Sequence, residues 1–272
     1  MTGTLLITGG TGTLGTAVIK HCLAYFPDLK IKSYSRDEFK AWTLNNELQS
    51  KRVEFVLGDV RDRDRVFEAC AGVNYIIHAA AAKHVWAGEQ HPYEVIQTNI
   101  VGTKNIVDAA NHHRCKMVLV SSDKAVQPTN LYGCTKMAAE AITINGSQRV
   151  VRYGNVFGSR GSVLHRFKEW AANGHSFRIT DRRMTRFVIT VQEAVKLVLD
   201  TLTMPPKSYN IPVLPAMRIV DLAWSFDKDA DIEEIGVQPG EKLHEFLTEK
   251  QSSEHARKLT IPEIQELIHA TI

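Results

Sequence analysis

The sequence predicts an α/β fold in which a doubly wound parallel sheet carries a small C-terminal cap. Three observations lead to this prediction. Short apolar runs alternate with segments of helical periodicity through the first half of the chain, a pattern typical of a parallel sheet. These runs are continuous rather than alternating, as expected for strands that are buried on both faces. A glycine-rich segment lies between the first expected strand and the first expected helix.

The first half of the chain supplies the expected sheet and most of its helices. We expect strands at Thr4–Thr8, Ile31–Ser35, Val53–Leu57, Tyr75–Ala80, Met117–Ser121 and Arg149–Arg152. A helix follows the first strand, because apolar residues from Leu14 to Phe26 recur at helical spacing. Further helices are expected at Arg63–Cys70, Pro92–His113 and Tyr132–Ile144. Together these elements predict that residues 1–156 form the sheet domain.

The pattern becomes irregular after about residue 156. We expect helices at Val163–Asn173, Val191–Leu202, Ile219–Trp224 and Pro262–Ile272, and short strands around Phe177–Thr180 and Tyr209–Val213. This portion is too small and too interrupted to fold alone. Residues 157–272 are therefore expected to form mainly a cap on the sheet, with some segments returning to the core.

Composition narrows the class of protein. The chain has 272 residues, 44% of them hydrophobic and 23% charged, which is ordinary for a soluble globular protein. The net charge of +3 is too small to indicate a nucleic-acid partner. No apolar run approaches the roughly 20 residues of a membrane span, and without a basic leader we expect no signal peptide. The 4 cysteines form neither a CxxC pair nor a zinc pattern, so we expect a reduced, cytoplasmic location and no metal.

The glycine-rich segment, residues 8–15, predicts a Rossmann-like dinucleotide site. Gly9 allows a tight turn, Gly12 lets the backbone approach a pyrophosphate, and Gly15 lets the helix pack closely on the strand. The helix then begins with free N–H groups and a partial positive charge that face the phosphates. The residues of this turn expected to bind the cofactor are Gly9, Thr11, Gly12, Thr13, Leu14 and Gly15. A purely structural turn is the alternative.

The ends of the next two strands bear on which dinucleotide is bound. Ser35 and Arg36 end the second strand, and Asp37 follows. An acidic residue here would hold the ribose hydroxyls of NAD, whereas an arginine would accept the extra phosphate of NADP. Because Arg36 is nearer the strand end, we favour NADP over NAD. Asp59 and Val60 follow the third strand, where the Asp59 carboxylate either bonds the adenine amino group or caps the next helix.

Candidate catalytic residues gather after the fifth strand. Ser122, Asp123 and Lys124 lie at its end, where ligands of open parallel sheets bind. Tyr132 and Lys136 are four residues apart in a helix and therefore share a face. A lysine ammonium beside a phenol lowers the pKa of the phenol, which makes it a base near neutral pH. Ser122 can orient the same substrate hydroxyl, while an ordinary surface Tyr–Lys pair is the alternative.

These residues resemble the extended short-chain dehydrogenase/reductase superfamily. Further segments resemble the configuration-inverting UDP-N-acetylglucosamine 4,6-dehydratase family, and the match spans nearly the whole chain. The segments that carry the resemblance are His78–Val85, Ser122–Ala125, Pro128–Gly133, Arg152–Val156, Gly158–Val163, Met184–Phe187 and Pro239–Glu245. Members that retain configuration carry Asp-Glu where this chain has Asp123-Lys124, which favours the inverting branch.

The resemblance implies a reaction and a role for each catalytic residue. Tyr132 would take the proton of the sugar 4-hydroxyl while bound NADP+ accepts hydride from C4. Lys124 would remove the proton from C5, and Asp123 would protonate the departing 6-hydroxyl. Hydride returned to C6 would recycle the cofactor in each turnover. The product would be a 4-keto-6-deoxy sugar inverted at C5, as at the start of pseudaminic acid biosynthesis and related polysaccharide pathways.

The resemblance also implies binding residues and an assembly. Besides the glycine turn, the residues implied for the cofactor are Ser35, Arg36, Asp59, Val60, Ala79, Ala80, Ala81, Asn99, Tyr132 and Lys136. Those implied for the UDP-sugar are Lys83, Asn155, Arg160, Ser162, Arg186, Gln238 and Glu241, with a structural cap or salt bridge as the alternative for each. A homo-oligomer, dimer or higher, is expected through the helices at 92–113 and 132–144.

The chain departs from the family pattern at several points. Gln238 stands where an arginine is usual, which predicts weaker or redistributed contact with a diphosphate. His165 replaces a proline and Cys134 a small residue, and relatives run longer. Three alternative functions follow from the same residues: a configuration-retaining dehydratase, a UDP-sugar 4-epimerase, and a cofactor-sensing binding protein without catalysis. The epimerase has no evident use for Asp123-Lys124, and the sensor none for Tyr132-Lys136.

Overall fold

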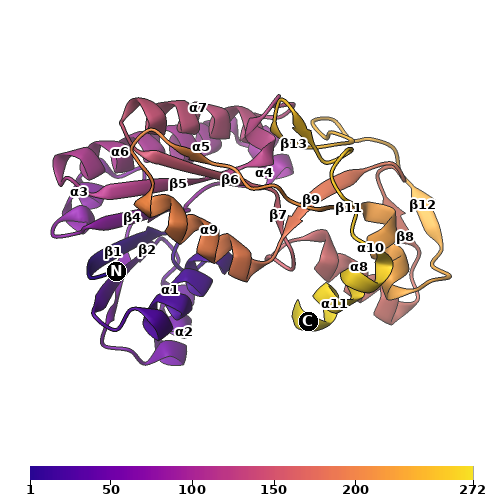
Figure 1. The fold of residues 1–272 in the computed structure, drawn as a ribbon, viewed down its shortest axis with the longest axis horizontal. Helices are drawn as coiled ribbons and strands as arrows, with labels where there is room; N and C mark the ends of the chain where they lie inside the picture. Colours follow the sequence, from indigo (N-terminus) through magenta and orange to yellow (C-terminus); the bar gives the residue numbers. More distant parts are fainter. Residues whose placement is uncertain (272) are drawn as a thin grey trace.

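A computed structural model describes residues 1–271 of the chain. Its centre is a parallel sheet of seven strands in the order β10-β6-β5-β4-β1-β2-β3 (Figure 1). The strands are β1 Gly3–Thr8, β2 Leu29–Ser35, β3 Val53–Leu57, β4 Tyr75–His78, β5 Lys116–Ser122, β6 Arg149–Tyr153 and β10 Tyr209–Asn210. This confirms the predicted Rossmann-like class.

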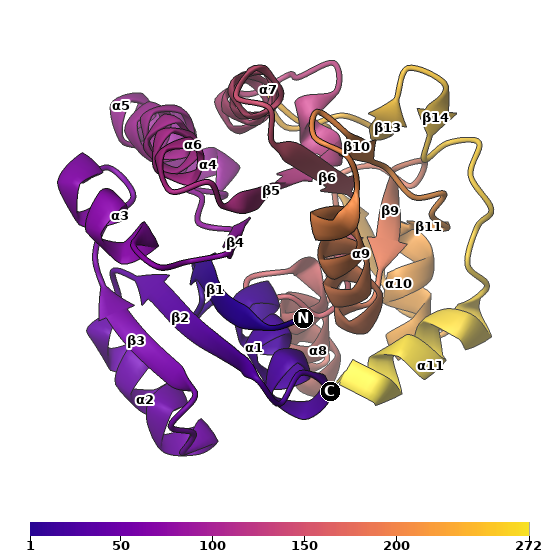
Figure 2. The same ribbon diagram turned by 60° about the vertical axis from the view of Figure 1, so that its left-hand side comes forward.

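Helices cover both faces of the sheet, as the continuous apolar strands require (Figure 2). One face packs against α1 Thr13–Tyr25, α2 Glu38–Leu48 and α9 Val191–Thr203. The other packs against α3 Arg63–Cys70, α6 Gly102–His112 and α7 Leu131–Asn145. Leu5 and Ile7 of β1 face the first helical layer and Leu6 the second, and all three are buried. Successive side chains of one strand therefore pack into two separate cores, one on each face of the sheet.

The order of the strands reverses between β1 and β4. β2 pairs with one side of β1 and β4 with the other. The crevice outside the carboxyl ends at such a reversal is where ligands bind in open α/β sheets. The segments that begin there are the glycine turn after β1 and the loop after β4. The latter leads through α4 Val85–Gln90 and α5 Pro92–Ile96 into a π-helical turn, η1 Gln97–Val101.

The cap is built on a third core at the carboxyl side of the sheet (Figure 1). Its helices are α8 Val163–Asn173, α10 Ile219–Phe226 and α11 Ile261–Thr271. Its strands are β7 Asn155–Val156, β8 Phe177–Ile179, β9 Thr185–Ile189, β11 Ala216–Arg218, β12 Ile232–Glu234, β13 Phe246–Thr248 and β14 Gln251–Ser252. They pair as β11-β9-β7, β12-β8 and β13-β14.

Several expected elements differ from those observed. Two expected strands are shorter: the one at Tyr75–Ala80 ends at His78, and the one at Tyr209–Val213 ends at Asn210. The helix expected at Pro92–His113 contains the π turn, and the last residue of the helix expected at Pro262–Ile272 lies outside the described residues. No helix within residues 1–271 is both long and apolar enough to span a bilayer.

Candidate active site

The glycine turn between β1 and α1 forms a close-packed cradle. Gly9 has φ +70°, and its N–H donates to Tyr34 O at 2.8 Å. A Cβ on Gly15 would lie 2.5 Å from Gly9 O, so only glycine allows α1 to begin this near the turn. Gly12 is the N-cap residue of α1 and supplies no side-chain acceptor. The first N–H groups of α1 thus remain available for phosphate, and the cradle fits a dinucleotide.

The residues after β2 differ in which polar groups they leave free. Ser35 Oγ is buried and has no hydrogen-bond partner within residues 1–271. The Asp37 carboxylate is engaged elsewhere, since it accepts from Lys40 N at 2.9 Å and from Lys40 Nζ at 2.6 Å at the start of α2. Arg36 is exposed beside it. An anion at this edge would therefore meet a free hydroxyl and a guanidinium rather than a free carboxylate.

Asp59, after β3, is held by arginines. It accepts from Arg61 Nε at 2.9 Å and lies 3.5 Å from Arg36 NH1. Burial acts to raise the pKa of Asp59, but the hydrogen bonds from Arg61 outweigh it and lower that pKa. The next helix is capped by Asp62, whose carboxylate accepts from Arg65 N. The helix-capping alternative for Asp59 is therefore wrong.

Asn99 lies in the π turn and holds the loop after β4. Its side chain accepts from Ala82 N at 2.8 Å and donates to Ala82 O at 3.0 Å. It also donates to Thr135 Oγ1 on α7 at 3.0 Å. These bonds engage both polar atoms of the buried amide. Asn99 thus holds the loop that includes Ala79, Ala80 and Ala81 through Ala82, and its contact with the cofactor stays a prediction.

The predicted catalytic residues Ser122, Asp123 and Lys124 form one cluster at the end of β5. Asp123 is fully buried in the short 3₁₀ turn η2, Asp123–Ala125. Its Oδ1 accepts from Ser122 Oγ at 2.9 Å and from Lys124 Nζ at 3.1 Å. Its Oδ2 is buried with no partner in the described part of the chain. The ammonium group of Lys124 also lies 3.3 Å from Asn155 Oδ1.

Glu245, which the sequence reasoning did not single out, completes this cluster from the cap. Its Oε1 lies 3.4 Å from Lys124 Nζ and 4.0 Å from Arg186 Nε, and its Oε2 lies 3.1 Å from Lys242 Nζ. The carboxylate is 3% exposed, so three cations share one buried anion. The signal was present in the sequence, because Glu245 ends the Pro239–Glu245 segment, in which Glu241 was chosen instead.

Charge coupling sets the proton states of the cluster. Burial raises the pKa of Asp123, and Lys124 only partly opposes this. Burial acts to lower the pKa of Lys124, but Asp123 and Glu245 outweigh it, so that pKa is raised. Burial acts to raise the pKa of Glu245, but the charges of Lys124, Arg186 and Lys242 outweigh it and hold that pKa below its ordinary value. The resting cluster therefore favours an ammonium on Lys124, whereas a base role needs the neutral amine.

Tyr132 and Lys136 differ from expectation in their electrostatics. Burial raises the pKa of Tyr132, and the cation that opposes this most is Lys124, not Lys136. Lys136 Nζ donates to Val120 O at 2.7 Å, and burial lowers its pKa to about 8. The prediction that Lys136 lowers the phenol pKa is thus wrong for this structure. The neighbouring Ser122 hydroxyl acts to lower the pKa of Tyr132, while in this structure it donates its proton to Asp123 Oδ1.

The remaining predicted substrate residues occupy two places. Arg186 lies in the catalytic cluster beside Glu245. Gln238 and Glu241 lie on an exposed cap loop, where Glu241 Oε2 accepts from Thr180 Oγ1 at 3.1 Å. Gly240 O of that loop accepts from Asn130 Nδ2 at 2.8 Å, just before α7. This loop therefore bridges the cap and the catalytic helix.

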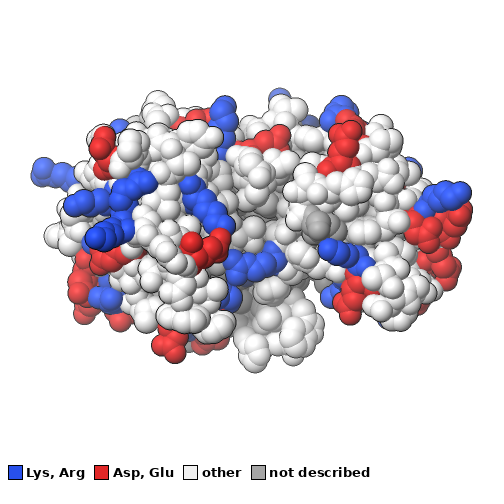
Figure 3. Space-filling model, turned by 90° about the horizontal axis from the view of Figure 1, so that it is seen from below, with Lys and Arg blue, Asp and Glu red and all other residues white. Residues whose placement is uncertain are grey.

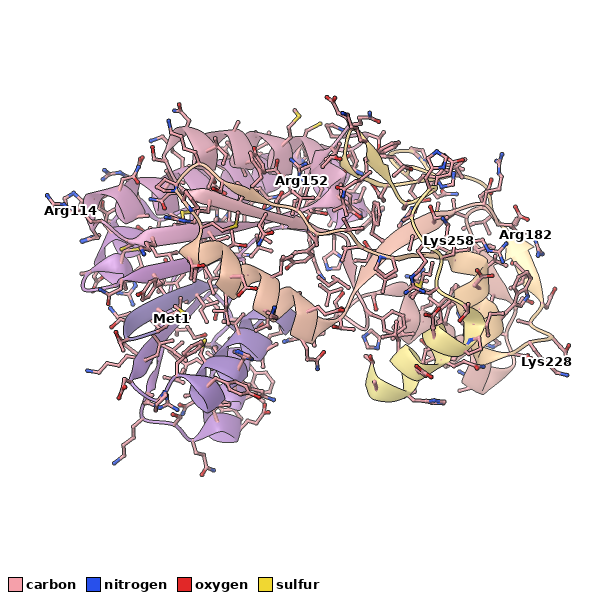
Figure 4. All side chains as sticks on the ribbon, in the orientation of Figure 1. Met1, Arg114, Arg152, Arg182, Lys228 and Lys258 are labelled. Carbon is pink, nitrogen blue, oxygen red and sulfur yellow. The ribbon has the colours of Figure 1, made fainter. Side chains whose placement is uncertain are left out.

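Behind α7 lies a separate cavity of about 580 Å³. It is lined by Met137, Glu140, Arg152, Tyr209 and Lys250, among others. Glu140 forms a buried ion pair with Arg152, which is labelled in Figure 4, and accepts from Ser121 Oγ at 2.5 Å. This network holds Ser121, the residue before Ser122. The cavity is not the dinucleotide crevice, since no residue of the glycine turn lines it.

A glycine turn at the strand reversal, together with Ser122 at the end of β5 and Tyr132 and Lys136 on α7, defines a short-chain dehydrogenase/reductase. Residues 5–266 match the family described as polysaccharide biosynthesis protein. The chain therefore belongs to this family, and the predicted resemblance is confirmed.

Curated relatives of this chain include enzymes of two different names. The chain is 41% identical to the UDP-N-acetylglucosamine 4,6-dehydratase (inverting) of Campylobacter jejuni, over 92% of this chain and 78% of the relative. It is 38% identical to a UDP-glucose 4-epimerase of Rickettsia rickettsii, over 94% and 79%. The two names correspond to the leading function and to one alternative from the sequence.

Solved structures share the fold. The structure of Pen from Bacillus thuringiensis matches with a TM-score of 0.92 and 30% identity, over 99% of this chain and 97% of that chain. The dTDP-glucose 4,6-dehydratase DesIV from Streptomyces venezuelae, solved with NAD and TYD bound, matches with a TM-score of 0.80 and 17% identity, over 98% and 96%. At 17% identity, the likeness to DesIV shows a common fold and nothing more.

Proposed function

We propose that the protein is an NADP-containing UDP-N-acetylglucosamine 4,6-dehydratase that inverts C5. The observation that carries the proposal is the pair formed by the buried Asp123 and the partly exposed Lys124 beside Tyr132, because a dehydratase needs an acid and a base in addition to the oxidation machinery. The inverting relative in Campylobacter jejuni supports the substrate, since it is 41% identical over most of this chain.

The Asp123–Lys124 pair can supply both groups by moving one proton. Transfer from Lys124 Nζ to Asp123 Oδ1, across 3.1 Å, leaves a neutral amine and a neutral acid. Burial of Asp123 raises its pKa and favours the neutral acid, whereas Asp123 and Glu245 raise the pKa of Lys124, so the neutral pair is the less populated tautomer at rest. Lys124 then accepts the proton from C5, and Asp123 donates its proton to the departing 6-hydroxyl, which leaves as water. The pair finishes as an ammonium and a carboxylate, so the proton count balances.

Tyr132 prepares this elimination. Bound nicotinamide supplies the hydride chemistry at C4 and C6, as cofactors of this fold do. Tyr132, oriented by Ser122, accepts the proton of the 4-hydroxyl. To act as this base, Tyr132 must already be a phenolate. Burial raises the pKa of Tyr132 and so opposes that form, whereas the ammonium of Lys124 favours it. Lys136, held on Val120 O, lies on the same helical face.

NADP rather than NAD is supported by the groups at the end of β2. The unpartnered Ser35 Oγ and exposed Arg36 suit a phosphate, and the engaged Asp37 is not free for ribose hydroxyls. On the substrate side, Ser162 Oγ is buried without a partner in residues 1–271 at the start of α8. A helix start with a free hydroxyl suits an anionic diphosphate, which supports the assignment of Ser162 to the UDP moiety.

The setting of the enzyme is part of the proposal. We infer a cytoplasmic location, supported by buried free thiols at Cys22, Cys70 and Cys115. We also infer a homo-oligomer through α5, α6 and α7, which rests on the family resemblance alone. The product would feed pseudaminic acid biosynthesis or a related polysaccharide pathway.

The test is incubation of the purified protein with UDP-N-acetylglucosamine, without added cofactor. We expect a product lighter by one water in mass spectrometry, and NADP rather than NAD released on denaturation. A product of unchanged mass that co-elutes with UDP-N-acetylgalactosamine would support the second candidate, a UDP-sugar 4-epimerase. That candidate is favoured by the name of the Rickettsia relative.

A further inference from the structure

A loop of the cap lies directly on the glycine turn. Arg160, between β7 and α8, donates from NH2 to Thr11 O at 2.6 Å, and its backbone N–H donates to Thr13 Oγ1 at 3.3 Å. In the chain, Arg160 lies 149 positions after Thr11 and 147 positions after Thr13. The cap thus makes direct hydrogen bonds to the glycine turn, which belongs to the sheet domain.

A second cation supports this loop. Lys83, from the segment after β4, donates from Nζ to Arg160 O at 3.0 Å. Partial burial and the charge of Arg160 lower the pKa of Lys83. No carboxylate of residues 1–271 lies within ion-pair distance of either side chain. Two neighbouring cations without an anion, in reach of the free N–H groups of α1, favour an anionic ligand.

The guanidinium has donors to spare for such a ligand. An arginine carries five N–H donors in a rigid fork, and the bond to Thr11 O uses one of them. The rest suit a phosphate, which arginine binds with bidentate geometry. Both Arg160 and Lys83 are exposed, so a ligand can reach them. Figure 3 shows basic side chains in the hollow between the sheet domain and the cap.

We propose that Arg160, supported by Lys83, closes over the glycine turn and holds the pyrophosphate of the dinucleotide, so that the cap retains the cofactor between turnovers. This rests on the proposed function, in which the cofactor is recycled and gains nothing from release. It reassigns Arg160 from the substrate diphosphate, which the sequence comparison implied, to the cofactor. Ser162, at the start of α8, stays on the substrate side of the same loop.

The test measures cofactor release without any sugar present. Protein loaded with NADPH is mixed with excess NADP+, and the loss of NADPH fluorescence gives the dissociation rate. We expect Arg160→Gln to raise this rate at least tenfold and Lys83→Met to raise it less. Arg166→Gln, an exposed arginine on α8 that stacks on Trp170, is the matched control and should leave the rate unchanged. Circular dichroism checks that each variant is folded.

Two results would overturn the proposal. One is an unchanged NADPH dissociation rate in Arg160→Gln together with a raised KM for UDP-N-acetylglucosamine, which would return Arg160 to the substrate. The other is an unchanged rate and an unchanged KM, which would leave Arg160 a structural bridge. Because release is measured without substrate, a protein that retains NADPH through Arg160 but makes no dehydrated product would contradict the proposed function and not this inference.

Discussion

At the residue scale, the site depends on buried charges that neutralise one another. Lys124 lies between the carboxyl groups of Asp123 and Glu245, and Glu245 also faces Arg186 and Lys242. Removing one member of a buried ion cluster is strongly destabilising, because the other charges stay buried without a partner. Glu245 therefore holds the cap against the catalytic turn, in addition to its effect on the protonation of Lys124.

Tyr132→Phe should abolish turnover and leave the cofactor site intact. The substitution removes the proton acceptor for the sugar 4-hydroxyl and nothing that the glycine turn contacts. We expect kcat to fall by about 10²–10⁴-fold, the usual worth of a general base, with an unchanged NADPH dissociation rate. Steady-state kinetics and the fluorescence chase check this. Residual activity above a tenth of wild type would exclude Tyr132 as the base.

Glu245→Gln should destabilise the protein by about 3–5 kcal/mol, because Lys124, Arg186 and Lys242 would lose their shared anion. Urea denaturation followed by circular dichroism measures this. Glu249→Gln is the matched control, since Glu249 is an exposed glutamate four residues further along the chain. Equal stabilities of the two variants would show that the cluster contributes no more than a surface charge.

At the element scale, His78 links the end of β4 to its neighbours. Its Nδ1 is 2.7 Å from Thr8 Oγ1 on β1, and its Nε2 is 3.1 Å from Thr103 Oγ1 on α6. The ring is fully buried, and burial lowers its pKa from 6.5 to about 3. The folded protein therefore keeps His78 neutral across mildly acid pH, while the unfolded chain binds a proton there.

This difference predicts a pH dependence of stability with a definite sign. Because the unfolded state binds more protons, the contribution of His78 is complete above pH 6.5 and is lost as the pH falls toward 3. The slope is about 1.4 kcal/mol per pH unit for one proton. His78→Gln should reduce the slope of the unfolding free energy against pH by that amount between pH 4.5 and 6. Urea titrations at several pH values measure this slope. An unchanged slope would mean that His78 is protonated in the folded protein.

Sequence periodicity predicted the elements that carry an apolar stripe. The ends of β3 and α3 are as expected, and so are those of α8, whose buried Leu164 and Phe167 face the cap core. The helix α2 was missed because it presents only Ala41 and Leu44 to the core. Its one clear signal was Asp37 as an N-cap, which was interpreted only as a ribose ligand.

The candidate site was predictable where one local segment makes the contacts. The glycine turn and the Ser122–Lys124 cluster form as expected, because each lies at the end of a strand. Contacts between distant segments were not predictable. Glu245 reaches Lys124 from the cap, and Arg160 reaches Thr11. The hydrogen bond from Lys136 to Val120 O was not predictable either. Spacing on a helix shows which residues share a face, but not the direction in which a flexible side chain points.

At the scale of the whole molecule, the sheet domain and the cap divide the chemistry. The sheet domain supplies the dinucleotide crevice and the Asp123–Lys124 pair, and the cap supplies Glu245 and Arg186 to the same cluster. Far from this junction, Arg182 pairs with Glu234 on the outer end of the cap (Figure 4). Elimination of water is therefore expected only when the sheet and the cap are together.

The central claim, an inverting dehydratase, is tested most directly by proton NMR of the reaction with UDP-N-acetylglucosamine in deuterated water. The account predicts a 4-keto-6-deoxy product with inverted configuration and deuterium at C5, since Lys124 exchanges its proton with solvent. A dehydrated product with retained configuration would exclude inversion. A sugar whose 6-hydroxymethyl group is unchanged would contradict the dehydratase altogether.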